Sequence, residues 1–242
     1  HTHSHSLTLT HTHSPKSFKI LSFLEDNSID IMFITETWLK DSNNFVTSIF
    51  RECSTYKSYN VIRDSNTWGG GVGILISSDL DSIMINVPKY KSFEVIVVSI
   101  RGSSNTTYLV GIYRRDIISF SIFLDEFSKF ITFLYSHSHP ILICGDFNIP
   151  WNLQHHTKTS QFSDMLNEYG LHPFVPDSKT HVKGNTIDFI LADELSSPLI
   201  NGISVDLSES IVSDHYPLTF NFSFTHNELK YSSTNSVDIF FL

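Results

Sequence analysis

Cysteine and long apolar runs are scarce in this chain of 242 residues. The two cysteines, Cys53 and Cys144, are too few for a disulfide framework, and this favours a reducing compartment. No run reaches the roughly 18 apolar residues that a membrane-spanning helix needs, so we expect no membrane span. The N-terminus also lacks the basic, apolar and small-residue regions of a secretory signal, so we expect an intracellular protein.

Positive charge is also in short supply. Lys and Arg number 16 against 25 Asp and Glu, which gives a net charge of −9. This balance excludes broad adhesion to polyanions, because such adhesion needs a basic surface. A phosphate substrate stays compatible with it, since carboxylates that hold a divalent cation present that cation to the phosphate.

The chain is long enough for one large domain, and its 20 Phe residues suit a core rich in β-sheet. Residues 1–14 alternate His, Thr and Ser and form a low-complexity tract. We assign residues 15–224 to the domain. Residues 225–242 show no periodicity, and we expect them to form an irregular tail.

Short apolar runs bounded by turn residues predict many strands, several of them in hairpins. These strands cover residues 29–34, 59–63, 72–76, 93–100, 106–113, 140–144, 186–192, 202–205 and 216–224. Apolar residues at helical spacing predict helices over residues 15–27, 117–135 and 159–169. Hairpins rule out a purely parallel sheet, so the pattern predicts a mixed α/β sandwich.

Acidic residues directly adjoin or lie within four of these apolar runs. Glu36 follows one run, Asp146 follows another, Asp188 lies within a third, and Asp214 with His215 opens the last. A single strand-end Asp is often only a turn former, but four carboxylates at one sheet edge repel each other unless a cation lies among them. Oxygen ligands select Mg²⁺, Mn²⁺ or Ca²⁺, and a neighbouring histidine can serve a phosphoryl group. The set predicts metal-assisted phosphodiester hydrolysis.

Six ordered motifs carry a resemblance to a known family. They are Ile34-Thr35-Glu36-Thr37-Trp38-Leu39, Gly69-Gly70-Gly71-Val72-Gly73, Tyr113-Arg114, Gly145-Asp146-Phe147-Asn148, Thr186-Ile187-Asp188-Phe189-Ile190 and Ser213-Asp214-His215. Residues 15–224 resemble the endonuclease/exonuclease/phosphatase superfamily, whose fold DNase I shares. Within it they are most similar to the endonuclease domain of non-LTR, LINE-type retrotransposons. The resemblance implies a four-layer α/β sandwich, in which two mixed, mostly antiparallel sheets pack face to face between helices.

The resemblance also implies a role for each matching residue. Glu36 would be the principal metal ligand, and Asp214 would lie at the same metal site. Asp146 would orient or deprotonate the attacking water, while Asn148 would contact the phosphate and help to hold that water. Tyr113 would donate a hydrogen bond to the scissile phosphate.

The remaining roles concern the transition state and the substrate. His215, paired with Asp188, would stabilise the transition state. Four residues would contact the substrate: Arg114, Thr180, His181 and Asn185. The implied activity is Mg²⁺-dependent nicking of DNA, with Mn²⁺ as an alternative, at chromosomal targets in the nucleus. The implied partner domain is a reverse transcriptase.

Three departures from the family pattern keep two alternatives open. The family has an Asn at the end of its first strand, whereas no Asn precedes Asn27 here, so that strand is expected to be replaced or truncated. Arg115 and Asp116 stand where the branch usually has two prolines, and no reverse-transcriptase region follows. The alternatives are a catalytically impaired remnant, and a phosphodiesterase or phosphatase of this fold that acts on a phosphoester other than DNA.

Overall fold

The structure is a computed structural model. It describes residues 20, 22–24, 26–39, 55–63, 69–102, 105–153, 155–207, 213–228 and 231–241. The low-complexity tract predicted at residues 1–14, the beginning of the first predicted helix, and Cys53 lie outside these ranges.

The described strands form two six-stranded sheets. The first sheet has the order β10 (Ile200–Val205), β11 (Leu218–Glu228), β12 (Tyr231–Phe241), β1 (Ile31–Thr35), β3 (Val72–Ser77) and β2 (Tyr56–Val61). The second has the order β4 (Ser82–Ile85), β5 (Phe93–Arg101), β6 (Thr106–Arg114), β7 (Ile141–Asp146), β9 (Asp188–Ala192) and β8 (His172–Phe174). A short 3-10 helix, η1 (Ser197–Leu199), leads into β10.

Strand directions are mixed in both sheets. β1 pairs in parallel with β12, and β6 pairs in parallel with β7. The other described pairs are antiparallel, including the predicted hairpins β2–β3 and β5–β6. This confirms the expectation of two mixed, mostly antiparallel sheets.

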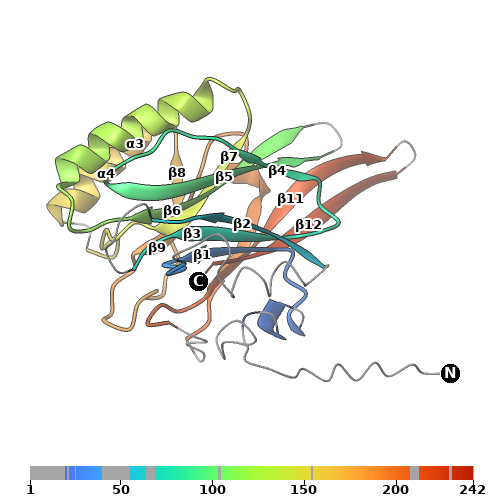
Figure 1. Ribbon diagram of the computed structural model, residues 1–242, viewed down its shortest axis with the longest axis horizontal. Helices are drawn as coiled ribbons and strands as arrows, with labels where there is room; N and C mark the ends of the chain where they lie inside the picture. Colours follow the sequence, from blue (N-terminus) through green and yellow to red (C-terminus); the bar gives the residue numbers. More distant parts are fainter. Residues whose placement is uncertain are drawn as a thin grey trace.

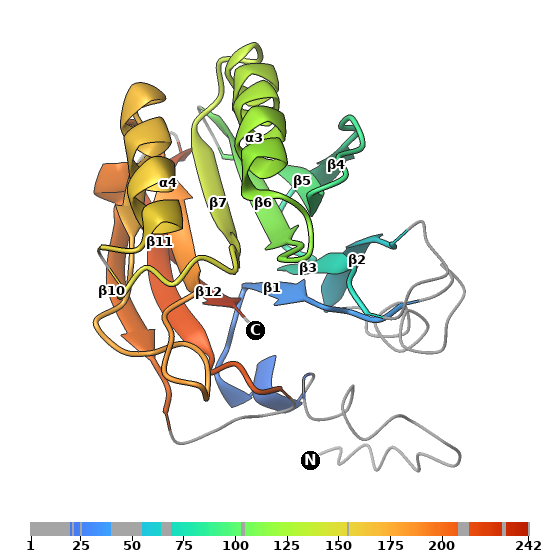
Figure 2. The ribbon, with the colours of Figure 1, turned by 90° about the vertical axis from the view of Figure 1, so that its left-hand side faces the viewer.

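The molecule has four layers (Figure 1), and a hydrophobic cluster lies between each pair of neighbouring layers. One cluster joins the inner faces of the two sheets. A second packs the outer face of the second sheet against α3 (Phe120–Tyr135) and α4 (Thr157–Glu168), which lie side by side in Figure 2. A third packs Ile20 and Leu24, from the helical segment before β1, on the outer face of the first sheet.

Both predicted internal helices are present, and their sequences explain their burial and their ends. In α3 the buried residues Phe123, Phe127, Phe130 and Leu134 recur every three or four positions and form the stripe that faces the sheet. Gly170 has φ +63°, a left-handed conformation that glycine adopts without steric cost, and it ends α4 as predicted. Within the described residues no helix has both the length and the apolar character to cross a membrane.

The tail prediction was wrong for residues 225–228 and 231–241. β11 continues to Glu228, and β12 occupies a central place between β11 and β1. Its backbone pairs along β11 and, from Ile239 to Phe241, with β1. Backbone pairing does not require an alternating apolar pattern, and the polar run in residues 232–236 therefore concealed the strand. The short strands β4 and β8 were also missed.

Candidate active site

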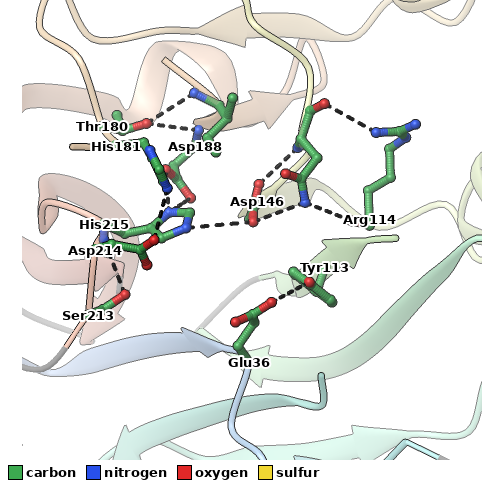
Figure 3. A network of polar contacts seen from close by, with 12 residues as sticks. Glu36, Tyr113, Arg114, Asp146, Thr180, His181, Asp188, Ser213, Asp214 and His215 are labelled. Carbon is green, nitrogen blue, oxygen red and sulfur yellow. Dashed lines mark hydrogen bonds and ion pairs between the residues drawn. The ribbon is translucent and has the colours of Figure 1, made fainter. Parts of the chain in front are cut away.

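Most of the predicted site residues lie at one edge of the layer between the two sheets (Figure 3). β6 and β7 run in parallel and end here, whereas the antiparallel strand β9 begins here. The register therefore places Tyr113, Asp146 and Asp188 in one row across three neighbouring strands. β1 leads to Glu36 from the first sheet, and the turn before β11 contributes residues 214–215. Strand ends from both sheets thus build the site.

His215 lies between two buried carboxylates. Its Nδ1 donates to both oxygens of Asp188, at 2.9 and 3.1 Å, and its Nε2 lies 4.0 Å from Asp146 Oδ2. Burial lowers the pKa of His215, but the hydrogen bond with Asp188 and the charges of Asp188, Asp146 and Asp214 outweigh this and raise the pKa to about 9. His215 is therefore a cation at neutral pH.

Asp146 is the carboxylate whose protonation the site perturbs most. Burial and the nearby charge of Asp188 raise the pKa of Asp146 well above its usual range. Its oxygens accept hydrogen bonds from the Asn148 backbone N–H, at 2.8 Å, and from the Asn148 side-chain amide, at 3.2 Å. Asn148 has φ +50°, a conformation that Asn tolerates better than most residues and that is common at functional sites.

Arg114 is fully buried, so the predicted direct contact of its side chain with substrate is wrong. It lies on the face of β6 that packs under α3, with its guanidinium 5.2 Å from the ring centroids of both Phe120 and Phe123. Its Nη1 donates to the backbone carbonyls of Phe147 and Asn148, at 3.3 and 3.2 Å. Arg114 thus supports the turn that carries Asp146 and Asn148.

Thr180 is also fully buried. Its side chain therefore cannot make the predicted contact with substrate. Its Oγ1 accepts hydrogen bonds from the backbone N–H groups of Ile187 and Asp188, at 3.0 and 3.1 Å. The Thr180 carbonyl accepts from the Tyr216 N–H at 2.7 Å. One residue therefore ties the start of β9 to the turn that carries His215.

His181 is buried as well. The sequence predicted that its side chain contacts substrate, whereas in the structure the side chain contacts Asp214. The Lys183 N–H donates to His181 Nδ1 at 3.0 Å, so the proton of the neutral ring lies on Nε2. That Nε2 donates to Asp214 Oδ2 at 3.1 Å. Burial raises the pKa of Asp214, but a backbone hydrogen bond and the neighbouring histidines outweigh it and lower the pKa.

Asn185 takes part in this arrangement through its backbone. Its carbonyl accepts from the N–H groups of Thr180 and His181, at 3.0 and 3.1 Å, and closes the loop between them. The side chain is half-buried. Contact of this amide with substrate stays a prediction.

Glu36 lies across the site from Asp214 and accepts a hydrogen bond from the Tyr113 hydroxyl (Figure 3). Burial and this bond raise the pKa of Tyr113, which therefore stays protonated. Glu36 has φ +50°, and the residues that follow it pair with the glycine run: the Trp38 N–H donates to the Gly70 carbonyl at 2.8 Å.

Glu94 is a supporting residue that the sequence reasoning missed. Its carboxylate accepts from Arg63 and from the Gly71 N–H, so it fixes the glycine run behind Glu36. A single acidic residue inside the apolar run of β5 was the available signal.

The donor set fits a hard divalent cation. The ligand atoms of His181, Asp214 and His215 lie within 4.8 Å of one another, and so do those of Asp146, Asp188 and His215. Because hydrogen bonds already engage the two histidines, the carboxylates are the groups that could bind the ion. Carboxylate oxygens dominate once Glu36 is added, and such ligands suit Mg²⁺ or Mn²⁺. A cation among them would also relieve the repulsion that raises the pKa of Asp146.

Comparison with known proteins gives one family and several solved structures with a similar fold. The model of the "Endonuclease/Exonuclease/phosphatase family" matches residues 14–215. The endonuclease domain of TRAS1, a telomere-specific non-LTR retrotransposon, is similar at 19% identity with a TM-score of 0.67, over 86% of this chain and 93% of that one. A 3′ phosphatase from Neisseria, bound to a product DNA hairpin, is similar at 19% identity with a TM-score of 0.62, over 85% of this chain and 93% of that one. An AP endonuclease from Leishmania major is similar at 10% identity with a TM-score of 0.65, over 83% of this chain and 80% of that one. No curated protein matches.

Proposed function

The chain belongs to the endonuclease/exonuclease/phosphatase family, and we propose that it is a divalent-metal-dependent DNA endonuclease that nicks one strand, as in target-site cleavage by a non-LTR retrotransposon. The observation that carries the proposal is the His215 ring held by Asp188 beside the buried Asp146. The similarity to the TRAS1 endonuclease domain favours DNA as the substrate and a nuclear target. A reverse transcriptase would be the partner domain.

In this mechanism Asp146 accepts the proton of the attacking water. The side-chain amide and the backbone N–H of Asn148 fix the orientation of this carboxylate. The water oxygen bonds to phosphorus and the bond from phosphorus to the 3′ oxygen breaks. The leaving oxygen takes up a proton, so the products are a 3′-hydroxyl and a 5′-phosphate.

Two further groups act on the phosphate. His215 donates from Nε2 to a phosphoryl oxygen while Asp188 holds the ring. The protonated Tyr113 would donate a second hydrogen bond to the phosphate once its hydroxyl hydrogen leaves Glu36. Glu36 and Asp214 would hold Mg²⁺ or Mn²⁺, and the bound ion would neutralise charge on the phosphoryl oxygens. His181 keeps Asp214 ionised and oriented.

The test uses a duplex labelled at the 5′ end of one strand and carrying a phosphate at the 3′ end of the other. With Mg²⁺ the proposal predicts internal cleavage, seen as shorter labelled fragments ending in 3′-hydroxyl. Asp214→Ala should abolish it, whereas Asp79→Ala, an exposed acid in the β3–β4 turn, should leave it unchanged.

The similarity to a 3′ phosphatase defines the second candidate, an enzyme that removes a terminal phosphate. Loss of the 3′-phosphate with no internal cleavage would support that candidate and contradict the nicking proposal. If a folded protein gives neither product, the chain would be an impaired remnant.

A further inference from the structure

A groove of about 530 Å³ lies beside the candidate active site. It is lined by the end of β2, by the connection from β4 to β5, by the first residues of β5 and by Arg115 after β6. We call it the β5 groove. None of the sequence motifs points to it.

The β5 groove and the active site share a wall. Arg63 and Glu94 line the groove, and the Arg63 guanidinium lies 5.7 Å from the centroid of the Tyr113 ring. Glu94 is also the register partner of Tyr113 across β5 and β6. Tyr113 in turn donates to Glu36. A polymer that crosses the site next to Tyr113 would therefore continue into the groove.

The lining is cationic although the whole chain carries a net charge of −9. It contains four basic residues, Arg63, Lys89, Lys91 and Arg115, and one acidic residue, Glu94. Glu94 is already bound by Arg63 and by a backbone N–H. The nearby carboxylate of Glu126 accepts from two backbone N–H groups and a serine hydroxyl. Of the cations that line the groove, the proposal below uses Lys91 and Arg115.

Arg115 has donors left for such a ligand. Its Nη1 donates to the Lys91 carbonyl at 3.5 Å, and its Nε is buried without a hydrogen-bond partner, so the Nη groups are the ones that a ligand could meet. A guanidinium has five N–H donors, and a bond of this length is weak. Phosphate is the group that best matches such a planar set of donors.

The floor of the groove is apolar. Ile85 and Val87 are half-buried, and Tyr90 presents a ring stacked on Phe93 with centroids 4.6 Å apart. Met84 is 41% exposed. Apolar and aromatic surface beside cations is the combination that binds a nucleic acid strand, since bases and sugars meet the floor and phosphates meet the rim.

We propose that the β5 groove binds the DNA strand on one side of the scissile phosphate, with phosphates on Arg115 and Lys91 and a nucleoside against Val87 and Tyr90. This rests on the proposed endonuclease function and extends it by naming where the substrate strand lies. The groove would supply affinity through phosphate contacts and would contribute little to sequence choice.

Binding without turnover tests the groove separately from the chemistry. We would measure the anisotropy of a fluorescent duplex in EDTA for the wild type and for Arg115→Gln with Lys91→Gln. A matched control is Arg101→Gln with Lys129→Gln, which removes two exposed basic residues away from the groove. The groove variant should bind about tenfold more weakly, and its log–log salt slope should fall by about 2, since each lost phosphate contact removes about one unit. Arg115→Lys keeps the charge but loses the planar set of donors, so its affinity should lie between those of the wild type and the groove variant.

The outcomes separate the two proposals. Selective weakening in the groove variant, with the control unchanged, supports the groove. Equal affinity of the groove variant and the wild type overturns it, as does absence of DNA binding by the wild type. If the groove variant binds more weakly but the wild type does not nick with Mg²⁺, the groove stands and the endonuclease proposal fails. Thermal melting monitored by circular dichroism checks that each variant is folded.

Discussion

The polar residues of this site are arranged in two pairs of a histidine and an aspartate. In one pair Asp188 fixes His215, and in the other His181 fixes Asp214. A β-bridge joins the two histidines, whose ring centroids lie 4.9 Å apart. Each pair therefore restrains the other, and a change in one residue should disturb both.

Thr180 is the residue where this restraint can be tested by stability. Thr180→Val keeps the shape of the side chain but removes the acceptor of two buried N–H groups. We expect a loss of about 2 to 3 kcal/mol in the free energy of unfolding, because buried donors left unpaired are costly. Thr180→Ser keeps the oxygen and should lose much less. Urea unfolding measures both, and equal losses would contradict the role assigned to the oxygen.

At the scale of elements, β7 positions Asp146 by lying flush against β6. A Cβ added to Gly145 would lie 2.2 Å from Ile112 Cγ2 and 2.3 Å from the Ile112 carbonyl oxygen. The backbone cannot give way there without moving the row of site residues. Only glycine fits this position.

Gly145→Ala should therefore lower the free energy of unfolding by about 1 to 3 kcal/mol, as overpacking of a core typically does. It should also reduce nicking under conditions where the variant is still folded, because Asp146 follows directly. Gly184→Ala is a useful comparison, since no atom lies within 4 Å of its added Cβ and only its φ of +93° opposes the change. Equal activity of Gly145→Ala and the wild type would contradict the positioning argument.

Glu126 couples α3 to β5 and makes stability depend on pH. Burial raises its pKa, but the hydrogen bonds from Ser92 and Lys91 outweigh this and lower it. A lowered pKa in the folded state means that the stabilisation is complete above the pKa of the unfolded chain and disappears as pH falls through the folded value.

Glu126→Gln should lower the free energy of unfolding by about 1 kcal/mol at pH 7, because the ionised hydrogen-bond acceptor is lost. The difference from the wild type should shrink as the pH falls below the ordinary pKa of a glutamate, about 4.3. Asp125→Asn, on the same helix in an exposed ion pair, is the matched control and should change little at either pH. If the difference in the free energy of unfolding between Glu126→Gln and the wild type did not change with pH, this account would be wrong.

Across the whole molecule, the sequence predicted most of the strands and the location of the site, because an apolar run ending in an acid is a local signal. The burial of Arg114 also had a local signal. Tyr108, Val110 and Ile112 alternate onto the face under α3, and Arg114 continues that row. The roles of Thr180 and His181 had none, because their partners come from β9 and from the turn before β11.

The place of β12 is the other feature that the sequence did not reveal. β12 lies between β11 and β1, so it joins the strand after His215 to the strand before Glu36. Its backbone pairs with both strands and so connects the two halves of the first sheet. Pairing of this kind depends on the whole sheet rather than on a sequence motif.

Relaxation of supercoiled plasmid tests the central claim that this site nicks DNA. The wild type is incubated with Mg²⁺, beside EDTA, His215→Ala and His172→Ala, an exposed histidine on β8. We predict open-circular product that requires the metal, falls about 10²- to 10⁴-fold in His215→Ala, as loss of a positioned acid–base group does, and is unchanged in His172→Ala. Relaxation that survives in His215→Ala, or its absence from a folded wild type, would contradict the account.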